Sequence, residues 1–201
     1  MKPFTRVDGL VMGAVAALAL TVWAARMALV PAALPVYGEV PAFAGVNAEG
    51  RAMDLRDLRG GVWVADFIFT RCAGQCPMMS ERMAALQRTF DGMPVRLLSF
   101  SVDPAHDTSA ALAAYGVRYG ARPGRWDLLT GDPDAIARLA QDGFRLAIAD
   151  GGPPQEPIVH SVRLVLVDQR GRIRGYYDAT DAAAVARLQR DARSLARRDM
   201  P

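Results

Sequence analysis

The stretch GVWVADFIFTRCAGQCPMM, residues 61–79, contains both cysteines of the chain, Cys72 and Cys76. Its first part, residues 61–70, is an apolar run of strand length, which favours a strand buried on both faces of a sheet. Pro77 fits the first turn of a helix, where a proline loses no backbone hydrogen bond. The stretch therefore predicts a strand–loop–helix unit with the two cysteines in the loop and at the helix start.

The same alternation of strands and helices continues on both sides of this unit. Strands are predicted over 95–103 and 126–131, and hairpins over 42–55 and 160–179 with turns at 47–50 and 169–171. Helices are predicted over 77–90, over 107–120 with Asp107 or Thr108 as the cap, over 133–142 and over 181–198. This order predicts an α/β protein with a thioredoxin-like fold and a central mixed sheet.

The N-terminus carries an apolar segment, residues 9–30, which holds 22 residues and a single charge, Arg26. A helix of roughly 20 apolar residues is long enough to span a bilayer core, and Arg26 near its end can extend to the interface. Lys2 and Arg6 precede the segment, so the positive-inside rule predicts a cytoplasmic N-terminus and an exported remainder. The alternative is a cleaved secretory signal with its cleavage site at 17–19, which would discard a good span.

The sequence thus divides into a cytoplasmic N-terminus (1–8), one transmembrane anchor (9–30), a proline-rich linker (31–40) and a thioredoxin-like domain (41–201). We expect a single-pass protein of the inner (cytoplasmic) membrane with its C-terminal domain on the periplasmic side. After residue 30 the chain holds 21 basic residues against 20 acids, so its charge gives no support for nucleic-acid binding.

Three residues separate the two cysteines, and the pair permits three kinds of chemistry. The N-terminus of a helix favours negative charge, so thiolates should form there more readily than in water. Two thiolates form half of a soft metal site suited to Cu(I) or Zn(II). A redox dithiol and a structural disulfide in an oxidising compartment are equally compatible with the pair alone.

A metal site of this kind needs a third ligand, and the chain has only two histidines. His160 opens the predicted strand after a Gly/Pro-rich loop, although a lone histidine is more often a cap or a surface residue. His106 precedes a helix and is expected to be an exposed turn residue. Met79 and Met83 lie on the apolar stripe of their helix, so core packing explains them better than copper binding does.

Four separated motifs give the chain a family resemblance: DFIFTRCAGQCPMMSERM, LLSFSVDPAHDTSAALAAYGVRYG, WDLLTG and HSVRLVLVDQRGRIRGYYD. In order and spacing they resemble the Sco/SenC family over roughly residues 40–196. Members of that family look like membrane-tethered thioredoxin folds that bind one copper ion and help to deliver it to the binuclear copper centre of cytochrome c oxidase.

The resemblance implies that Cys72, Cys76 and His160 are the copper ligands, and that the copper-receiving subunit of cytochrome c oxidase is the partner. Copper is expected as Cu(I), with Cu(II) as a second state, and the protein as a metallochaperone without turnover. The alternative is an enzyme, a thiol-disulfide oxidoreductase that uses Cys72 and Cys76 and has a thioredoxin-like reductant as partner. Two departures from the family pattern are the Ala-Gly-Gln interval between the cysteines and Val159 before the histidine.

Overall fold

The computed structural model describes residues 15, 17–21, 23, 33–150 and 158–197 of the 201-residue chain. The chain divides into two compact units, Met1–Leu34 and Pro35–Pro201. In the first unit the described residues 15, 17–21 and 23 are helical. Within the described part of the chain, no helix combines the length and the apolar character needed to cross a membrane. Most of the predicted anchor, residues 9–30, lies outside the described residues.

The second unit is built on an eight-stranded mixed sheet with the order β1-β10-β9-β4-β5-β6-β2-β3. β4, β5 and β6 are parallel to one another, and the strands next to them on either side, β9 and β2, run antiparallel to them. The strands of this sheet are β1 (Gly38–Glu39), β2 (Ala44–Asn47), β3 (Ala52–Asp54), β4 (Val62–Ile68), β5 (Val95–Ser101), β6 (Trp126–Thr130), β9 (Arg163–Val167) and β10 (Arg172–Asp178). A separate two-stranded sheet pairs β7 (Ile148–Asp150) with β8 (Ile158–His160).

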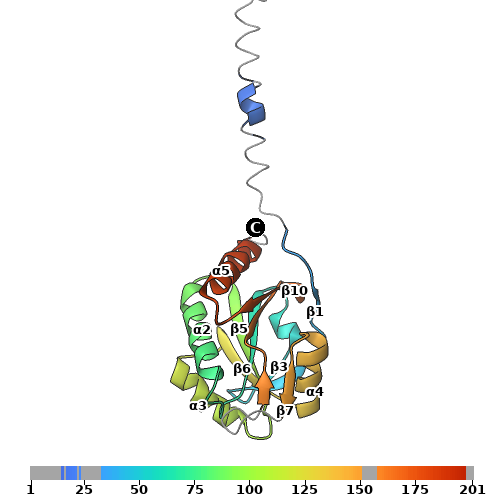
Figure 1. Ribbon diagram of the computed structural model, residues 1–201, viewed down its shortest axis with the longest axis vertical. Helices are drawn as coiled ribbons and strands as arrows, with labels where there is room; N and C mark the ends of the chain where they lie inside the picture. The colour runs from blue at the N-terminus through green and yellow to red at the C-terminus, as the bar shows by residue number, and fades with distance from the viewer. Residues whose placement is uncertain (1–14, 16, 22, 24–32, 151–157, 198–201) are drawn as a thin grey trace, which may run out of the picture. The chain divides into compact units, whose positions relative to one another are not determined.

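Helices cover both faces of the large sheet (Figure 1). α2, α3 and α5 lie on one side of the sheet, and α4 lies on the other. The helical elements are a 3₁₀ turn η1 (Leu55–Leu58), α2 (Cys76–Thr89), α3 (Ser109–Tyr119), α4 (Pro133–Arg138), a π-helical turn η2 (Leu139–Gly143) and α5 (Ala182–Arg197). This arrangement confirms the predicted α/β class with a central mixed sheet.

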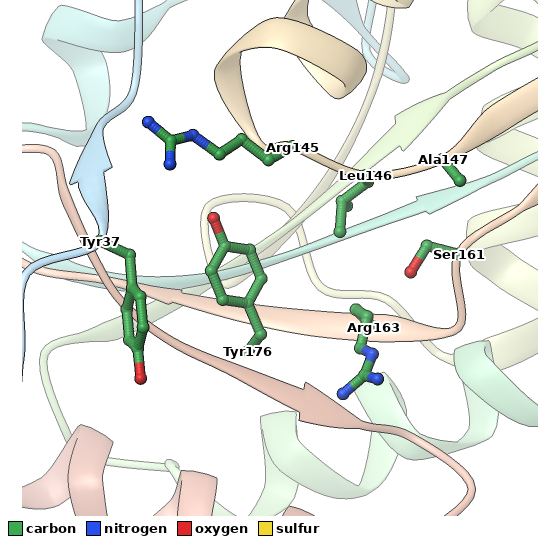
Figure 2. A pocket seen from close by; sticks show the side chains of 7 residues that line it. All are labelled: Tyr37, Arg145, Leu146, Ala147, Ser161, Arg163 and Tyr176. Carbon is green, nitrogen blue, oxygen red and sulfur yellow. The ribbon is translucent and has the colours of Figure 1, made fainter.

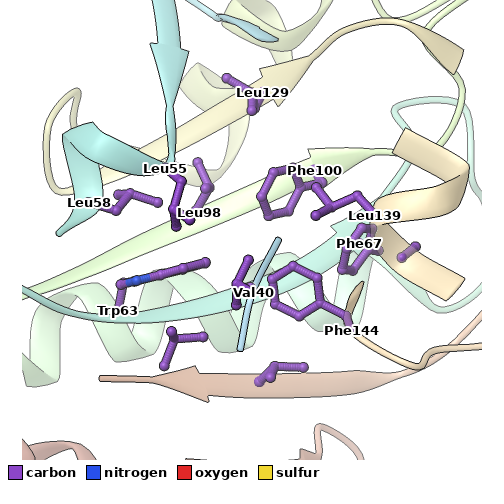
Figure 3. Close-up of a cluster of buried hydrophobic side chains, with 14 of the residues drawn as sticks. Val40, Leu55, Leu58, Trp63, Phe67, Leu98, Phe100, Leu129, Leu139 and Phe144 are labelled. Atoms are coloured by element: carbon purple, nitrogen blue, oxygen red, sulfur yellow. The ribbon is translucent and has the colours of Figure 1, made fainter. Parts of the chain in front are cut away.

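The side chains of β4 alternate between two hydrophobic clusters. Trp63 and Phe67 point to the face under η1 and α4, where Phe67 stacks on Phe100 at a centroid distance of 5.1 Å (Figure 3). Ile68 points to the opposite face, where it packs with the two cysteines and with α3. All seven residues of β4 are buried, as the apolar run predicted. Because successive strand residues alternate, Asp66 shares the face of Ile68 and the cysteines.

The beginning of the folded unit differs from the predicted boundary at residue 41. Tyr37 donates its N–H to Ile173 O at 2.9 Å, and β1 pairs with β10 as the edge strand of the sheet. Val40 is buried in the core. The predicted linker therefore contributes a strand from its second half, because the outer edge of β10 offers unpaired backbone groups that an extended segment satisfies.

Most other predicted elements are confirmed, with small shifts at their ends. Thr108, and not Asp107, caps α3 by accepting from Ala111 N–H at 3.2 Å. The helix predicted over 133–142 ends its α-helical part at Arg138 and continues as the π turn η2. The strand predicted to open at His160 is wrong in one respect, because His160 ends β8 and the next strand, β9, begins at Arg163.

Candidate metal centre

Cys72 and Cys76 lie together at the junction of β4 and α2. Cys76 is the first residue of α2, and Pro77 follows it in the first turn, as predicted. Both cysteines are reduced. Their thiols lie within hydrogen-bond range of each other, and Cys76 also bonds to the backbone of Phe69. Residues 73–75 between them are exposed, so the connecting loop faces solvent.

Burial dominates the electrostatics of Cys76. Cys76 is fully buried, and Cys72 is 7% exposed. Burial raises the pKa of the Cys76 thiol far above its usual range, and this effect exceeds the stabilisation of the thiolate by the Phe69 backbone. The prediction that the helix start makes both thiolates form readily is therefore wrong for Cys76. The helix dipole acts on a group that has lost its hydration, and the loss of hydration outweighs it.

Thr70 and Arg71, which precede Cys72, connect the cysteine loop to the segment between β5 and α3. Asp107, which is fully buried, accepts hydrogen bonds from Thr70 N–H at 3.1 Å and from the Thr70 hydroxyl at 2.6 Å. The Ser101 hydroxyl donates to Asp107 Oδ2, the oxygen that also accepts from Thr70 N–H. Arg71 forms an ion pair with Asp103, with 2.7 Å between Nη2 and Oδ2. The cysteine loop is thus held by a buried carboxylate and a partly exposed ion pair.

His106 belongs to this polar cluster and not to the thiol pair. Its Nδ1 lies 2.8 Å from Asp103 Oδ1 and 2.9 Å from Arg71 Nη2. The side chain is 55% exposed, in agreement with the predicted turn position. In this arrangement His106 supports the ion pair between Arg71 and Asp103.

The backbone of His160 lies toward the same end of the sheet strands as the cysteine loop. β9 runs antiparallel to β4, with Ala65 opposite Val165. The start of β9 therefore lies beside the end of β4, which leads directly into the cysteine loop. His160 lies three positions before Arg163, the first residue of β9, and pairs with Ile148 of β7. The side chain of His160 lies outside the described residues, and among the described side chains no group of three His, Cys, Asp or Glu residues forms a metal site.

A second buried carboxylate, Asp66, lies on the cysteine face of β4 and was missed by the sequence reasoning. Ser99 donates its hydroxyl to Asp66 Oδ1 at 2.5 Å, and Trp126 Nε1 donates to Ser99 at 2.9 Å. Asp66 Oδ2 has no hydrogen-bond partner within the described part of the chain. Burial raises the pKa of Asp66 to about 7. The sequence did contain a signal, because Asp66 is the one acid within the apolar run GVWVADFIFT. An acid at this position is unusual only if the whole strand is buried.

A mixed sheet is covered on both faces by helices, and a dithiol lies where β4, the first of its parallel strands, leads into α2. This arrangement defines an α/β protein of the thioredoxin-like class. The model of the SCO1/SenC family matches residues 35–195. The chain belongs to the SCO1/SenC family. The observed fold and the match to the family model confirm the resemblance and the fold expected from the four motifs.

The curated relatives of the chain carry Sco names. The SCO1 protein homolog of Bacillus subtilis (strain 168) is 33% identical over 150 residues, which cover 73% of this chain and 77% of that protein. The mitochondrial SCO2 homolog of Bos taurus is 28% identical over 148 residues, which cover 70% of this chain and 54% of that protein. The chain thus spans most of the bacterial relative and about half of the mitochondrial one.

Solved structures of Sco proteins have the same fold. A SCO1/SenC family lipoprotein from Bacillus anthracis str. Ames is 32% identical with a TM-score of 0.74, and the match covers 81% of this chain and 97% of that one. BsSco, described as a member of the Sco family of cytochrome c oxidase assembly proteins with a disulfide switch, is 30% identical with a TM-score of 0.72 and the same coverage. ScoI of Bradyrhizobium japonicum, solved with copper bound, has a TM-score of 0.64 at 23% identity, over 76% of this chain and 98% of that one.

Proposed function

We propose that the protein is a copper metallochaperone that binds one copper ion through Cys72, Cys76 and His160 and delivers it to the binuclear copper centre of cytochrome c oxidase. The observation that carries the proposal is the adjacent pair of reduced cysteines, Cys72 and Cys76, at the end of the sheet beside the start of β9, which the His160 segment precedes. Family membership supports it, since one Sco relative is an oxidase assembly protein and another holds copper.

The donor set suits this cargo. Two sulfurs on one side and an imidazole from a separate strand would give a three-coordinate site, which Cu(I) accepts readily. Cys72 and Cys76 are packed among apolar residues, including Ile68 and Leu112, so few waters compete for the metal. The exposed residues 73–75 leave one side of the pair open, where a ligand of the receiving subunit could approach and take the ion.

The alternative function is a thiol-disulfide oxidoreductase, and the contact between the two thiols favours it. Thiols within hydrogen-bond range of each other need little movement to form a disulfide. Cys72 is the more exposed of the two and would be the attacking thiol, with Cys76 as the resolving one. A thioredoxin-like protein would then return the disulfide to the dithiol. This chemistry uses the cysteines and has no need of His160.

Replacing His160 by alanine separates the two functions. Copper binding should weaken at least about tenfold, and most strongly for Cu(II), because the imidazole is the nitrogen ligand that this ion favours. Formation of the Cys72–Cys76 disulfide and its exchange with a small thiol should keep their rates, because both depend on the sulfurs. Affinities are measured by competition with a chromogenic chelator, and exchange by thiol titration.

His106→Ala is the matched control, because it removes the other histidine and leaves the proposed ligands in place. It should leave copper affinity unchanged. In cells that depend on the protein for oxidase assembly, His160→Ala should fail to support assembly. If His160→Ala supports normal oxidase assembly while Cys72→Ser does not, the oxidoreductase function replaces the chaperone.

We further propose that residues 9–30 anchor the protein in the inner membrane with the domain on the periplasmic side. Lys2 and Arg6 before the apolar segment support this orientation. A reporter enzyme that is active only outside the cytoplasm, fused after Pro201, should therefore be active. A matched fusion of a reporter that works only in the cytoplasm should be silent. The reverse pattern would contradict both the location and copper delivery to an extracytoplasmic site.

A further inference from the structure

The outer face of α5, at the outside of the folded unit (Figure 1), carries four arginines. Six residues of this helix are buried: Ala184, Val185, Leu188, Ala192, Leu195 and Ala196. With about 3.6 residues per turn, the four arginines fall within about 120° of the helix circumference, on the side opposite the buried residues. The arginine row consists of Arg187, Arg190 and Arg197, which are exposed, and Arg193, which is partly exposed.

The acids of the described structure do not neutralise this row. Asp191 is the only acid within α5, and it accepts from the Tyr177 hydroxyl of β10 at 2.7 Å. Asp181 precedes the helix and lies 3.7 Å from Arg187, and both side chains are about half exposed. The other three arginines form no ion pair with a described residue within 4.0 Å. Residues 198–201, outside the described part, add one arginine and one aspartate to the sequence.

The spacing of the row is unfavourable for an isolated helix. Its members are three, three and four positions apart, so that neighbouring guanidinium groups lie close together on the helix surface. Like charges at these spacings repel each other and destabilise the helix. The remaining positions of the outer face, Ala183, Ala186 and Ser194, are neutral. The row therefore fits a helix whose outer face meets a negatively charged surface.

The start of the folded unit limits how far the domain can move from a membrane. Tyr37 is fixed on β10 by its hydrogen bond to Ile173 and by an edge-to-face contact with Tyr176 at 5.5 Å (Figure 2). With residues 9–30 as the anchor proposed above, only residues 31–34 separate the anchor from Pro35, where the folded unit begins. The extended chain from residue 30 to Pro35 spans at most about 18 Å. Lipid headgroups are therefore within reach of the domain.

The last turn of α5 is connected to this point of attachment. Arg174 of β10 donates through Nε to Pro35 O at 2.9 Å and through Nη1 to Asp168 Oδ2 at 2.7 Å. Gln169, the next residue, donates through Nε2 to Leu195 O at 3.0 Å. Since Leu195 belongs to the last turn of α5, a short series of contacts connects the attachment point to the end of the arginine row.

We propose that the arginine row binds the anionic phospholipid headgroups of the membrane that carries the anchor. A guanidinium stays charged at physiological pH, and its planar donors match the oxygens of a phosphate. The row extends over about 15 Å of the helix, so a surface of many phosphates can engage all four arginines, which a single small anion cannot do. The inference rests on the proposed anchor and does not depend on the copper ligands.

The test uses the full-length, copper-free protein in lipid nanodiscs of phosphatidylcholine, with or without phosphatidylglycerol. Phenylglyoxal modifies accessible guanidinium groups, and mass spectrometry of the peptides gives the rate at each arginine. The row should react at least about fivefold more slowly in the anionic discs, the effect that one basic residue has on binding to an anionic membrane. At about 1 M salt, where the Debye length is roughly 3 Å, the difference should disappear.

Arg138 is the internal control for this experiment, because it is exposed on α4, which lies on the other side of the sheet. It should react at the same rate in both kinds of disc. Equal rates for the row in neutral and anionic discs would overturn the proposal, since contact with the headgroups would then not depend on their charge.

The Arg190→Gln, Arg193→Gln double variant removes the middle of the row and leaves Arg187 and Arg197 as reporters. In anionic discs both should react nearly as fast as in neutral discs, because loss of two charges weakens binding about 25-fold. The matched Arg190→Lys, Arg193→Lys variant keeps the charges and should keep the protection. Without lipid, the thermal midpoint of the glutamine variant should stay the same or rise, since repulsion is removed. Protection that survives in the glutamine variant would refute a role for the row.

Retention of the protein in the discs at high salt tests the anchor separately. Loss of the protein from both kinds of disc under this condition would contradict the anchor alone, because the row is judged at low salt by the difference between the two lipids. Copper is absent from every assay, so no result here bears on the copper proposal.

Discussion

Serine in place of Cys72 or Cys76 is expected to weaken Cu(I) binding by at least about 100-fold, more than the roughly 10–100-fold that follows loss of an outer-shell partner. The reason is the change of donor. A serine hydroxyl keeps the size of the side chain but is a hard, neutral oxygen, whereas Cu(I) selects soft thiolates. The affinity of the reduced protein is measured anaerobically, by competition with a chromogenic Cu(I) chelator.

Met78→Leu is the matched control for this experiment. Met78 is a partly buried residue of α2, two positions after Cys76, and it carries the nearest other sulfur in the sequence. Its replacement should leave Cu(I) affinity unchanged, because the thioether is not among the proposed ligands. Full affinity in either serine variant would place the metal elsewhere in the protein.

The Asp66→Asn variant is expected to be more stable than the wild type at pH 8, by up to about 4 kcal/mol. Burial raises the pKa of Asp66 from 3.8 to about 7 in the folded state. The folded protein therefore holds more protons than the unfolded chain between about pH 4 and pH 7, and the stability of the wild type falls as pH rises through this window. Asparagine removes the ionisation and can still accept from Ser99 through its Oδ1.

The measurement is urea unfolding of the reduced, copper-free protein at pH 5 and pH 8. The wild type should lose roughly 2–3 kcal/mol between these values relative to Asp66→Asn. Cys76 and Tyr115 do not contribute to the difference in stability between pH 5 and pH 8. Burial raises the pKa of Cys76 above its ordinary value of 9.0 and that of Tyr115 above 10.0, so neither group ionises in this range. Asp134→Asn, at an exposed position of α4, should keep the pH dependence of the wild type. Parallel curves for wild type and Asp66→Asn would contradict a raised pKa at Asp66.

The sequence was sufficient for the local pattern of the fold. The apolar run of β4, the stripe on α2 that includes Met79 and Met83, and the hairpin turn at 169–171 each follow from spacing and turn chemistry, and each is found in the structure. These features depend on neighbours in the chain. Local preferences and tertiary packing agree at these positions, so the pattern alone was enough.

The features that sequence reasoning missed depend on residues far apart in the chain. Asp107 was one of the two residues expected to cap α3, together with Thr108, but its carboxylate binds Thr70, 37 positions earlier. The raised pKa of Cys76 follows from the depth at which the helix start is buried, which helix position alone does not reveal. Arg145, whose backbone has φ +54°, comes shortly after the π turn η2. The hydrophobic periodicity of the sequence does not distinguish such a turn from an α-helix. Each required the folded environment of the side chain.

The hydrogen bonds between Asp107 and Thr70 also bear on how a metal would enter and leave. A binding loop that is mobile must lose conformational freedom when it closes on its cargo, and that loss weakens the affinity. Here folding itself has already restricted the chain next to Cys72, because a buried carboxylate holds both the N–H and the hydroxyl of Thr70. An arriving ion would therefore find its sulfur donors already in position. Its exchange with a partner would be governed by competition between ligands and not by ordering of the loop.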